Sequence, residues 1–134
     1  MGTLAVETLW GSFRSLQLAL VLNPHYASAY HGKGHVLYDL KRPHEAVASY
    51  ERAMQLKPHL VEAYNDKASV LYEYQHYEEA LAAYEQAIQL QPNNAVLYNY
   101  KSRTLKQLGR LKEAHQAYEK ARQLGYIGRQ TNGS

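Results

Sequence analysis

The sequence predicts an all-α fold: a solenoid of about seven helices, arranged as antiparallel helix-turn-helix hairpins. Prolines recur at one constant interval, at Pro24, Pro58 and Pro92. Two sets of tyrosines keep the same period, namely Tyr30, Tyr64 and Tyr98, and Tyr50, Tyr84 and Tyr118. Within each unit, small and apolar residues are spaced by three and four, which is typical of amphipathic helices. A period of this length with two helices indicates stacked repeats.

Composition and charge exclude several classes of protein. The chain has 134 residues with a formal net charge of +3, and its 13 tyrosines are the unusual feature. Its longest apolar run, 18–22, is far shorter than the ~20 residues that span a bilayer. Because no signal peptide opens the chain, we expect a cytoplasmic protein. The absence of cysteine excludes disulfides and thiolate ligands, and we expect no cofactor.

The first segment, 1–26, is predicted to be half a repeat. Counting back by one period aligns Pro24 with Pro58 and makes 9–22 the second helix of an incomplete hairpin. Trp10, Leu18 and Val21 then occupy positions where the next repeat has polar residues. Terminal repeats normally carry a polar outer face. We therefore predict that these three side chains form an association surface, either with a second copy or with further repeats of a longer protein.

Three full repeats are predicted at 27–60, 61–94 and 95–128, followed by a flexible tail at 129–134. In the first repeat, helices at 27–40 and 44–56 flank a turn in which Pro43 can begin a helix. Gly109 supplies a permissive backbone at the equivalent turn of the third repeat. Small residues are expected where the helices cross closely. These are Gly34, Ala68 and Ser102 on the first helices, and Ala46, Ala80 and Ala114 on the second. We expect the periodic tyrosines to fill the space between them.

One unit carries a family resemblance. In 61–94, the pattern consists of Tyr64, Ala68, Leu71, Tyr77, Ala80, Tyr84, Ala87 and Pro92. This pattern, together with the length of the period, resembles the tetratricopeptide repeat. The resemblance implies a right-handed solenoid that binds a protein or peptide partner. It departs from the family at Lys33, Lys67 and Lys101, where leucine is common. We expect these lysines to lay their aliphatic stems across the neighbouring helix.

The resemblance also implies that the first helix of each repeat lines a concave groove. The expected groove residues are His31, His35, Tyr38, Asp39, Asn65, Asp66, Ser69, Tyr72, Glu73, Asn99, Tyr100, Arg103 and Lys106. Their charge changes from neutral or acidic in the first two repeats to basic in the third. This gradient favours an extended peptide or helix that carries charges of both signs.

Recognition of a chaperone's C-terminal carboxylate is not expected. The family members that bind such tails use Lys, Asn and Arg side chains on these faces. The corresponding positions here hold His31, His35, Asp66, Val96 and Tyr100. Because Asp66 would repel a carboxylate, we predict that chaperone tails do not bind.

A chelating arrangement is present on one predicted helix. His31, His35 and Asp39 follow one another at spacings of four, which places them on one helical face. Such a set can hold Zn²⁺ or Ni²⁺. Histidine pairs at this spacing are common by accident, and no HExxH motif accompanies them. We therefore expect polar groove residues here, and no metal ion.

The sequence favours a non-catalytic interaction scaffold, with two alternatives. It contains no glycine-rich phosphate loop and no nucleophile elbow. One alternative is a regulatory or docking module of a larger enzyme, such as a bacterial protein kinase or transferase. The other is RNA binding through the basic residues of the third repeat, although a solvated basic face is the simpler interpretation. These residues are Lys101, Arg103, Lys106, Arg110 and Lys112.

Overall fold

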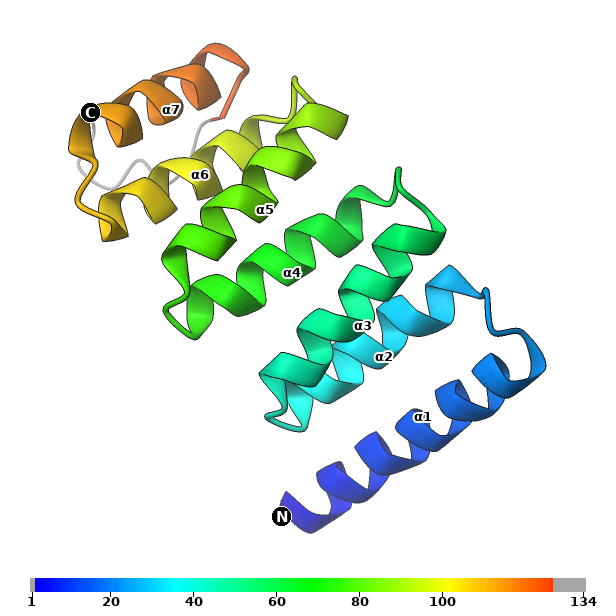
Figure 1. The fold of residues 1–134 in the computed structure, drawn as a ribbon. Coiled ribbons are helices and arrows are strands. Elements are labelled where there is room, and N and C mark those ends of the chain that lie inside the picture. The colour runs from blue at the N-terminus through cyan, green and yellow to red at the C-terminus, as the bar shows by residue number, and fades with distance from the viewer. Residues whose placement is uncertain (1, 127–134) are drawn as a thin grey trace.

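The computed structural model describes residues 2–126, and the side chains of 5–126. Seven α-helices and no strand occur in this part of the chain. They are α1 (Gly2–Leu22), α2 (Ala27–Asp39), α3 (Pro43–Leu56), α4 (Val61–Glu73), α5 (Tyr77–Leu90), α6 (Ala95–Gln107) and α7 (Leu111–Gln123). Figure 1 shows them as a staggered stack that runs from α1 to α7. No described helix is long and apolar enough to cross a membrane.

The packing is that of a solenoid. The main backbone contacts join helices that follow one another in the chain, so α2–α3, α4–α5 and α6–α7 form three antiparallel hairpins. α1 packs against α2 at one end of the stack. A stack in which each unit contacts its neighbours is the defining geometry of repeat proteins. The predicted fold class is therefore confirmed.

The predicted small residues lie where the helices cross. Ala46, Ala68 and Ala80 are fully buried. Gly34 leaves room for the ring of Tyr50, since a Cβ atom at Gly34 would lie within 2.8 Å of three ring carbons. Tyr50 is 1% exposed. A tyrosine ring on α3 thus packs directly against the backbone of α2, as the ridge-and-groove argument requires.

The turn inside each hairpin has the same geometry. The N–H of Arg42 donates to the carbonyl of Leu37 at 2.9 Å, and His76 and Arg110 repeat this bond at 2.8 and 3.0 Å. The residue before each of them is left-handed, with φ of 64° at Lys41, 68° at Gln75 and 75° at Gly109. Only the third turn uses glycine there, as predicted. The first two hold a side chain in a conformation that costs ~1–2 kcal/mol.

The lysines that replace the family's leucine reach back to the preceding hairpin. Lys67 Nζ lies 2.9 Å from Glu51 Oε2, and Lys101 Nζ lies 3.4 Å from Glu85 Oε2. Lys33 has no equivalent carboxylate, because one period before Glu51 the chain has Gln17. Its Nζ lies instead 5.5 Å from the centre of the Phe13 ring. In the second and third repeats, the ammonium group of this lysine therefore forms an ion pair with the preceding hairpin.

The N-terminal segment differs from its prediction in length. α1 begins at Gly2, whereas the sequence predicted a helix from Leu9. The surfaces of Leu18 and Val21 are 61% and 75% exposed, so that both side chains are accessible to a partner. Trp10 is half-buried: its ring meets Phe13 edge-on at 5.5 Å, and the Arg42 guanidinium lies 5.5 Å from its centre. The predicted tail, 129–134, lies outside the described residues.

Candidate peptide-binding groove

Three neighbouring cavities follow the helices α2, α4 and α6. The first junction, a cavity of about 160 Å³, lies between α2, α3 and α4. The second junction, of about 490 Å³, lies between α4, α5 and α6. A third cavity of about 310 Å³ lies between α6 and α7. Ser69 and Glu73 line the first two cavities and Arg103 lines the last two, so the three form one continuous surface.

Two histidines and an aspartate meet at the first junction. His31 and His35 lie one turn apart on α2, and Asp66 projects from α4. Asp66 Oδ2 lies 2.7 Å from His31 Nε2 and 3.3 Å from His35 Nε2. On the other side of the His35 ring, Nδ1 lies 3.2 Å from the hydroxyl of Tyr50. The first junction is therefore a polar cluster that joins α2, α3 and α4.

Two tyrosines of the first junction are held in their protonated form. The Tyr38 hydroxyl donates a hydrogen bond to the Glu73 carboxylate; this bond, followed by burial and the nearby negative charges, raises the pKa of Tyr38 to about 12. Burial, followed by the negative charges of Asp66 and Asp39, raises the pKa of Tyr50 above its usual value. Because both phenols stay neutral at physiological pH, both hydroxyls remain hydrogen-bond donors.

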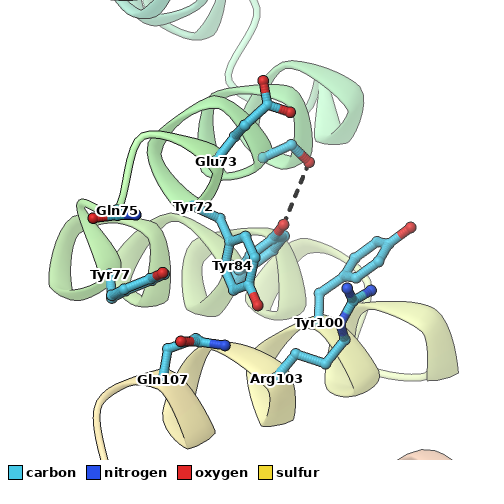
Figure 2. Close-up of a pocket in the computed structure, with 9 residues that line it drawn as sticks. Tyr72, Glu73, Gln75, Tyr77, Tyr84, Tyr100, Arg103 and Gln107 are labelled. Atoms are coloured by element: carbon cyan, nitrogen blue, oxygen red, sulfur yellow. Dashed lines mark hydrogen bonds between the residues drawn. The ribbon is translucent and has the colours of Figure 1, made fainter.

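Aromatic rings line the second junction. Tyr72 and Tyr77 meet at 5.3 Å between ring centres, and Tyr84 and Tyr100 at 5.4 Å. Figure 2 shows these four rings around the cavity, with Gln107 and Arg103 of α6 on one side. The Tyr84 hydroxyl lies 3.3 Å from Oγ of Ser69, the dashed line in Figure 2. The second junction is thus a tyrosine-lined hollow with hydrogen-bonding groups on its walls.

Positive charge borders this hollow. The guanidinium of Arg103 lies 5.9 Å from the centre of the Tyr72 ring, a distance at which cation–π attraction holds the side chain in place. Arg103 and Lys106 are both exposed. Stacking on tyrosine orients the guanidinium without consuming its hydrogen-bond donors, which leaves them free for a ligand carboxylate.

Most of the predicted groove residues lie on these cavities. His35, Tyr38, Asp66, Ser69 and Glu73 come together at the first junction. Tyr72, Tyr100 and Arg103 line the second, and Asn99 and Lys106 line the third. His31 joins the group through its contact with Asp66.

Asp39 and Asn65 line none of the three cavities. Asp39 also has no place in the histidine cluster, where the sequence had put it. Among the described residues, the acidic group within reach of His31 and His35 is Asp66. Residue 39 is a full turn further along α2 than His35, whereas α4 carries Asp66 alongside both rings.

The sequence reasoning missed the residues that the second helices contribute. Tyr77 and Tyr84 of α5 line the second junction, and Tyr50 of α3 lines the first. The signal that could have found Tyr50 and Tyr84 is a spacing of 15 residues, which joins His35 to Tyr50 and Ser69 to Tyr84. An antiparallel hairpin with a short turn brings these positions together. The periodic tyrosines were expected to be packing residues alone.

The helix-hairpin stack and its groove define the class of an α-helical repeat scaffold. A family model described as tetratricopeptide repeat matches residues 25–93, just over half of the chain. A second model with the same description matches residues 83–116. The chain belongs to the tetratricopeptide repeat family, whose fold is a scaffold for protein interactions.

Solved structures share this fold. A crystal structure of MamA superposes with a TM-score of 0.80 at 23% sequence identity, over 87% of this chain and 68% of that one. A second MamA structure gives 0.79 at 24% identity, over 84% and 61%. A double mutant of MamA RS-1 gives 0.80 at 21% identity, over 91% and 68%. The likeness is one of fold. No curated protein matches the chain.

Proposed function

We propose that this chain binds an extended peptide segment of a partner protein along the surface formed by α2, α4 and α6. The observation that carries the proposal is the second junction, a hollow of about 490 Å³ lined by four tyrosines beside an exposed arginine. Aromatic walls accept an apolar or aromatic side chain, and their hydroxyls offer hydrogen bonds to a peptide backbone. Tyrosine and arginine are also among the residues most enriched at the energetic centres of interfaces.

The charges along the surface specify the peptide further. Arg103 and Lys106 on α6 suit an acidic residue of the ligand, one or two positions from the side chain that enters the hollow. Glu73, which lines both the first and the second junction, suits a basic residue of the ligand on the other side of the hollow. We therefore propose a ligand in which an apolar or aromatic residue stands between a basic and an acidic one.

A displayed library of random peptides tests this proposal. We expect selection to enrich peptides with the stated pattern. Arg103→Ala should weaken the binding of the enriched peptides at least about tenfold, within the usual range for a residue at the centre of an interface. The matched control is Arg122→Ala on α7, whose side chain is 59% exposed and pairs with Glu119. Equal binding by both variants, or enrichment of no peptide above background, would contradict the proposal.

RNA binding has less support from the contacts of the basic residues. Lys101 pairs with Glu85 at 3.4 Å, and Arg110 Nε donates to Glu113 Oε1 at 2.8 Å. These carboxylates reduce the positive charge that the third repeat offers to a phosphate backbone. Weak binding of single-stranded RNA with a shallow salt dependence is expected. A steep loss of RNA affinity between low and moderate salt would restore this alternative. The alternative of a docking module of a larger enzyme is compatible with the same peptide groove.

Association through α1 remains a proposal supported by exposure. Leu18, Val21 and Leu22 expose 61%, 75% and 81% of their surfaces on one terminal helix. Leu18→Lys and Val21→Lys should shift any concentration-dependent sedimentation of the chain toward the monomer. Sedimentation as a monomer by the unsubstituted chain at every concentration would remove self-association and leave a further partner as the occupant.

A further inference from the structure

We propose that His31, His35 and Asp66 form a binding site for one divalent transition-metal ion, with Zn²⁺ as the representative ligand. Each residue offers one ligand atom, and the three atoms lie within 4.8 Å of one another. Two imidazoles and one carboxylate are a donor set that zinc and its neighbours in the first transition row prefer. Among residues with described side chains, no other group of three such donors is this compact.

The distances fit a metal ion after a small adjustment. Zinc ligands lie at about 2.0–2.2 Å from the ion, so two ligands of a tetrahedral site are roughly 3.3 Å apart. His35 Nε2 and Asp66 Oδ2 already lie 3.3 Å apart, and His31 Nε2 lies 2.7 Å from the same oxygen. To admit the ion, the His31 ring would move away from Asp66 Oδ2 by about half an ångström. The two imidazoles, whose ligand atoms lie within 4.8 Å of each other, would converge on the metal.

The ring nitrogen of His35 that faces away from the proposed metal has a suitable partner. A ligating imidazole usually donates its other N–H to a neighbouring acceptor, which fixes the tautomer and the ring. His35 Nδ1 lies 3.2 Å from the Tyr50 hydroxyl, which can accept that N–H. Tyr50 is 1% exposed and is held by the close contact with Gly34. Its ring centre lies 5.6 Å from that of His35 and 5.7 Å from that of His31, so both imidazoles pack on one rigid tyrosine.

The site would be open on one side. The side chain of His35 is 53% exposed, while those of His31 and Asp66 are 21% and 25% exposed. Three protein ligands at the edge of a cavity leave a fourth position for water. Bound metal would also link α2 to α4, and hence the first repeat to the second, through bonds far stronger than the hydrogen bonds present without it.

The repeat itself supplies variants that should fold. One period after His31 and His35, the chain has Asn65 and Ser69, in the same fold and against the equivalent tyrosine. The double variant His31→Asn/His35→Ser therefore places on α2 the side chains that α4 already carries. Asp66→Asn keeps the shape of the third ligand and removes its charge. The control is His44→Gln/His76→Gln, which removes two histidines whose ring centres are 6.4 Å apart.

Isothermal titration of the untagged chain with ZnCl₂ tests the site. We expect one ion per chain, with binding that weakens in acid because the imidazoles must be neutral. His31→Asn/His35→Ser and Asp66→Asn should each lower zinc affinity at least about tenfold, since loss of a mere supporting contact already costs about 10- to 100-fold. The control should bind as the unsubstituted chain does. Circular dichroism should show unchanged helix content in every variant.

Binding of Co²⁺ gives a second readout, which would not change if these residues had only a structural role. Co²⁺ should show the strong visible d–d absorption of a tetrahedral complex with the unsubstituted chain and with the control, and only the weak absorption of hydrated Co²⁺ with the double variant. The proposal is overturned if the control loses as much affinity as the double variant. It is also overturned if the double variant keeps the zinc stoichiometry and affinity of the unsubstituted chain, or if millimolar zinc produces no binding.

Discussion

The first and second junctions have the same buried tyrosine in the same register, but they surround it with different chemistry. Tyr50 and Tyr84 are 1% and 3% exposed, and each places its hydroxyl near a side chain 15 residues earlier, at 3.2 and 3.3 Å. At the first junction that side chain is His35, which lies beside His31 and Asp66. The equivalent positions of the second junction hold Ser69, Asn65 and Tyr100. The same repeat position thus holds a potential metal ligand, Asp66, at the first junction and an aromatic residue, Tyr100, at the second.

This difference distinguishes positions at which the repeat fold constrains the side chain from positions at which the side chain can vary. Positions at which helices cross must fit a fixed spacing, so Gly34, Ala68 and Ser102 are all small. Positions 35 and 66 line the cavity between the first two hairpins, and position 31 contacts position 66 beside it. The solenoid places few demands on these side chains. Such positions can diverge from repeat to repeat without loss of the fold, and this is where binding chemistry arises.

The largest expected effect tests whether the two tyrosines are equivalent. Tyr50→Ala and Tyr84→Ala should each lower the free energy of unfolding by about 3–5 kcal/mol, the usual cost of removing a buried aromatic ring. Urea denaturation followed by circular dichroism measures both. A loss below about 1 kcal/mol at either position would show that its ring is not part of the core. Unequal losses would show that the junctions differ in packing as well as in chemistry.

The first junction has glycine, Gly34, at the position where the second junction has alanine, Ala68. Gly34→Ala should destabilise the chain by about 1–3 kcal/mol, because the new Cβ meets the buried Tyr50 ring. Ala68 occupies the equivalent position beside Tyr84 without such a conflict. The control is Gly11→Ala in α1, where an added Cβ meets nothing within 4 Å. There the higher helix propensity of alanine should stabilise by ~0.5–1 kcal/mol. Effects of the same sign at both glycines would contradict the steric explanation.

The turn before the second helix of a hairpin allows two opposite substitutions with smaller expected effects on stability. Lys41→Gly should stabilise the first hairpin by about 0.5–1 kcal/mol, because Lys41 has φ of 64° and glycine adopts this conformation without penalty. Gly109→Lys, at the equivalent turn with φ of 75°, should destabilise by a similar amount. Thermal unfolding of both variants measures the two shifts, which should be of opposite sign. A loss of stability in Lys41→Gly would mean that the lysine side chain makes a contact that outweighs the backbone strain.

The sequence predicted features that recur with the repeat period and failed where a contact depends on how the repeats are stacked. Pro43 begins a helix, and Ala46 and Ala80 are buried, as expected from the pattern within one hairpin. Asp39 was assigned to the histidine cluster because a spacing of four residues relates side chains along one helix only. Asp66 comes from the next hairpin, at a distance set by the twist between repeats. The start of α1 at Gly2 was missed because the helix one period later, α3, begins at Pro43, which aligns with Leu9.

The smallest expected effect concerns the lysines that link each hairpin to the one before. Gln17→Glu would place a carboxylate where the later repeats have Glu51 and Glu85, on the cavity wall that Lys33 also lines. We expect a gain of ~0.2–1 kcal/mol in the free energy of unfolding, typical of an exposed ion pair. The gain should disappear in about 1 M salt, where charges are screened within ~3 Å. It should also be absent in a Lys33→Met background. A gain that survives both conditions would arise within α1 itself and would contradict an ion pair between residues 17 and 33.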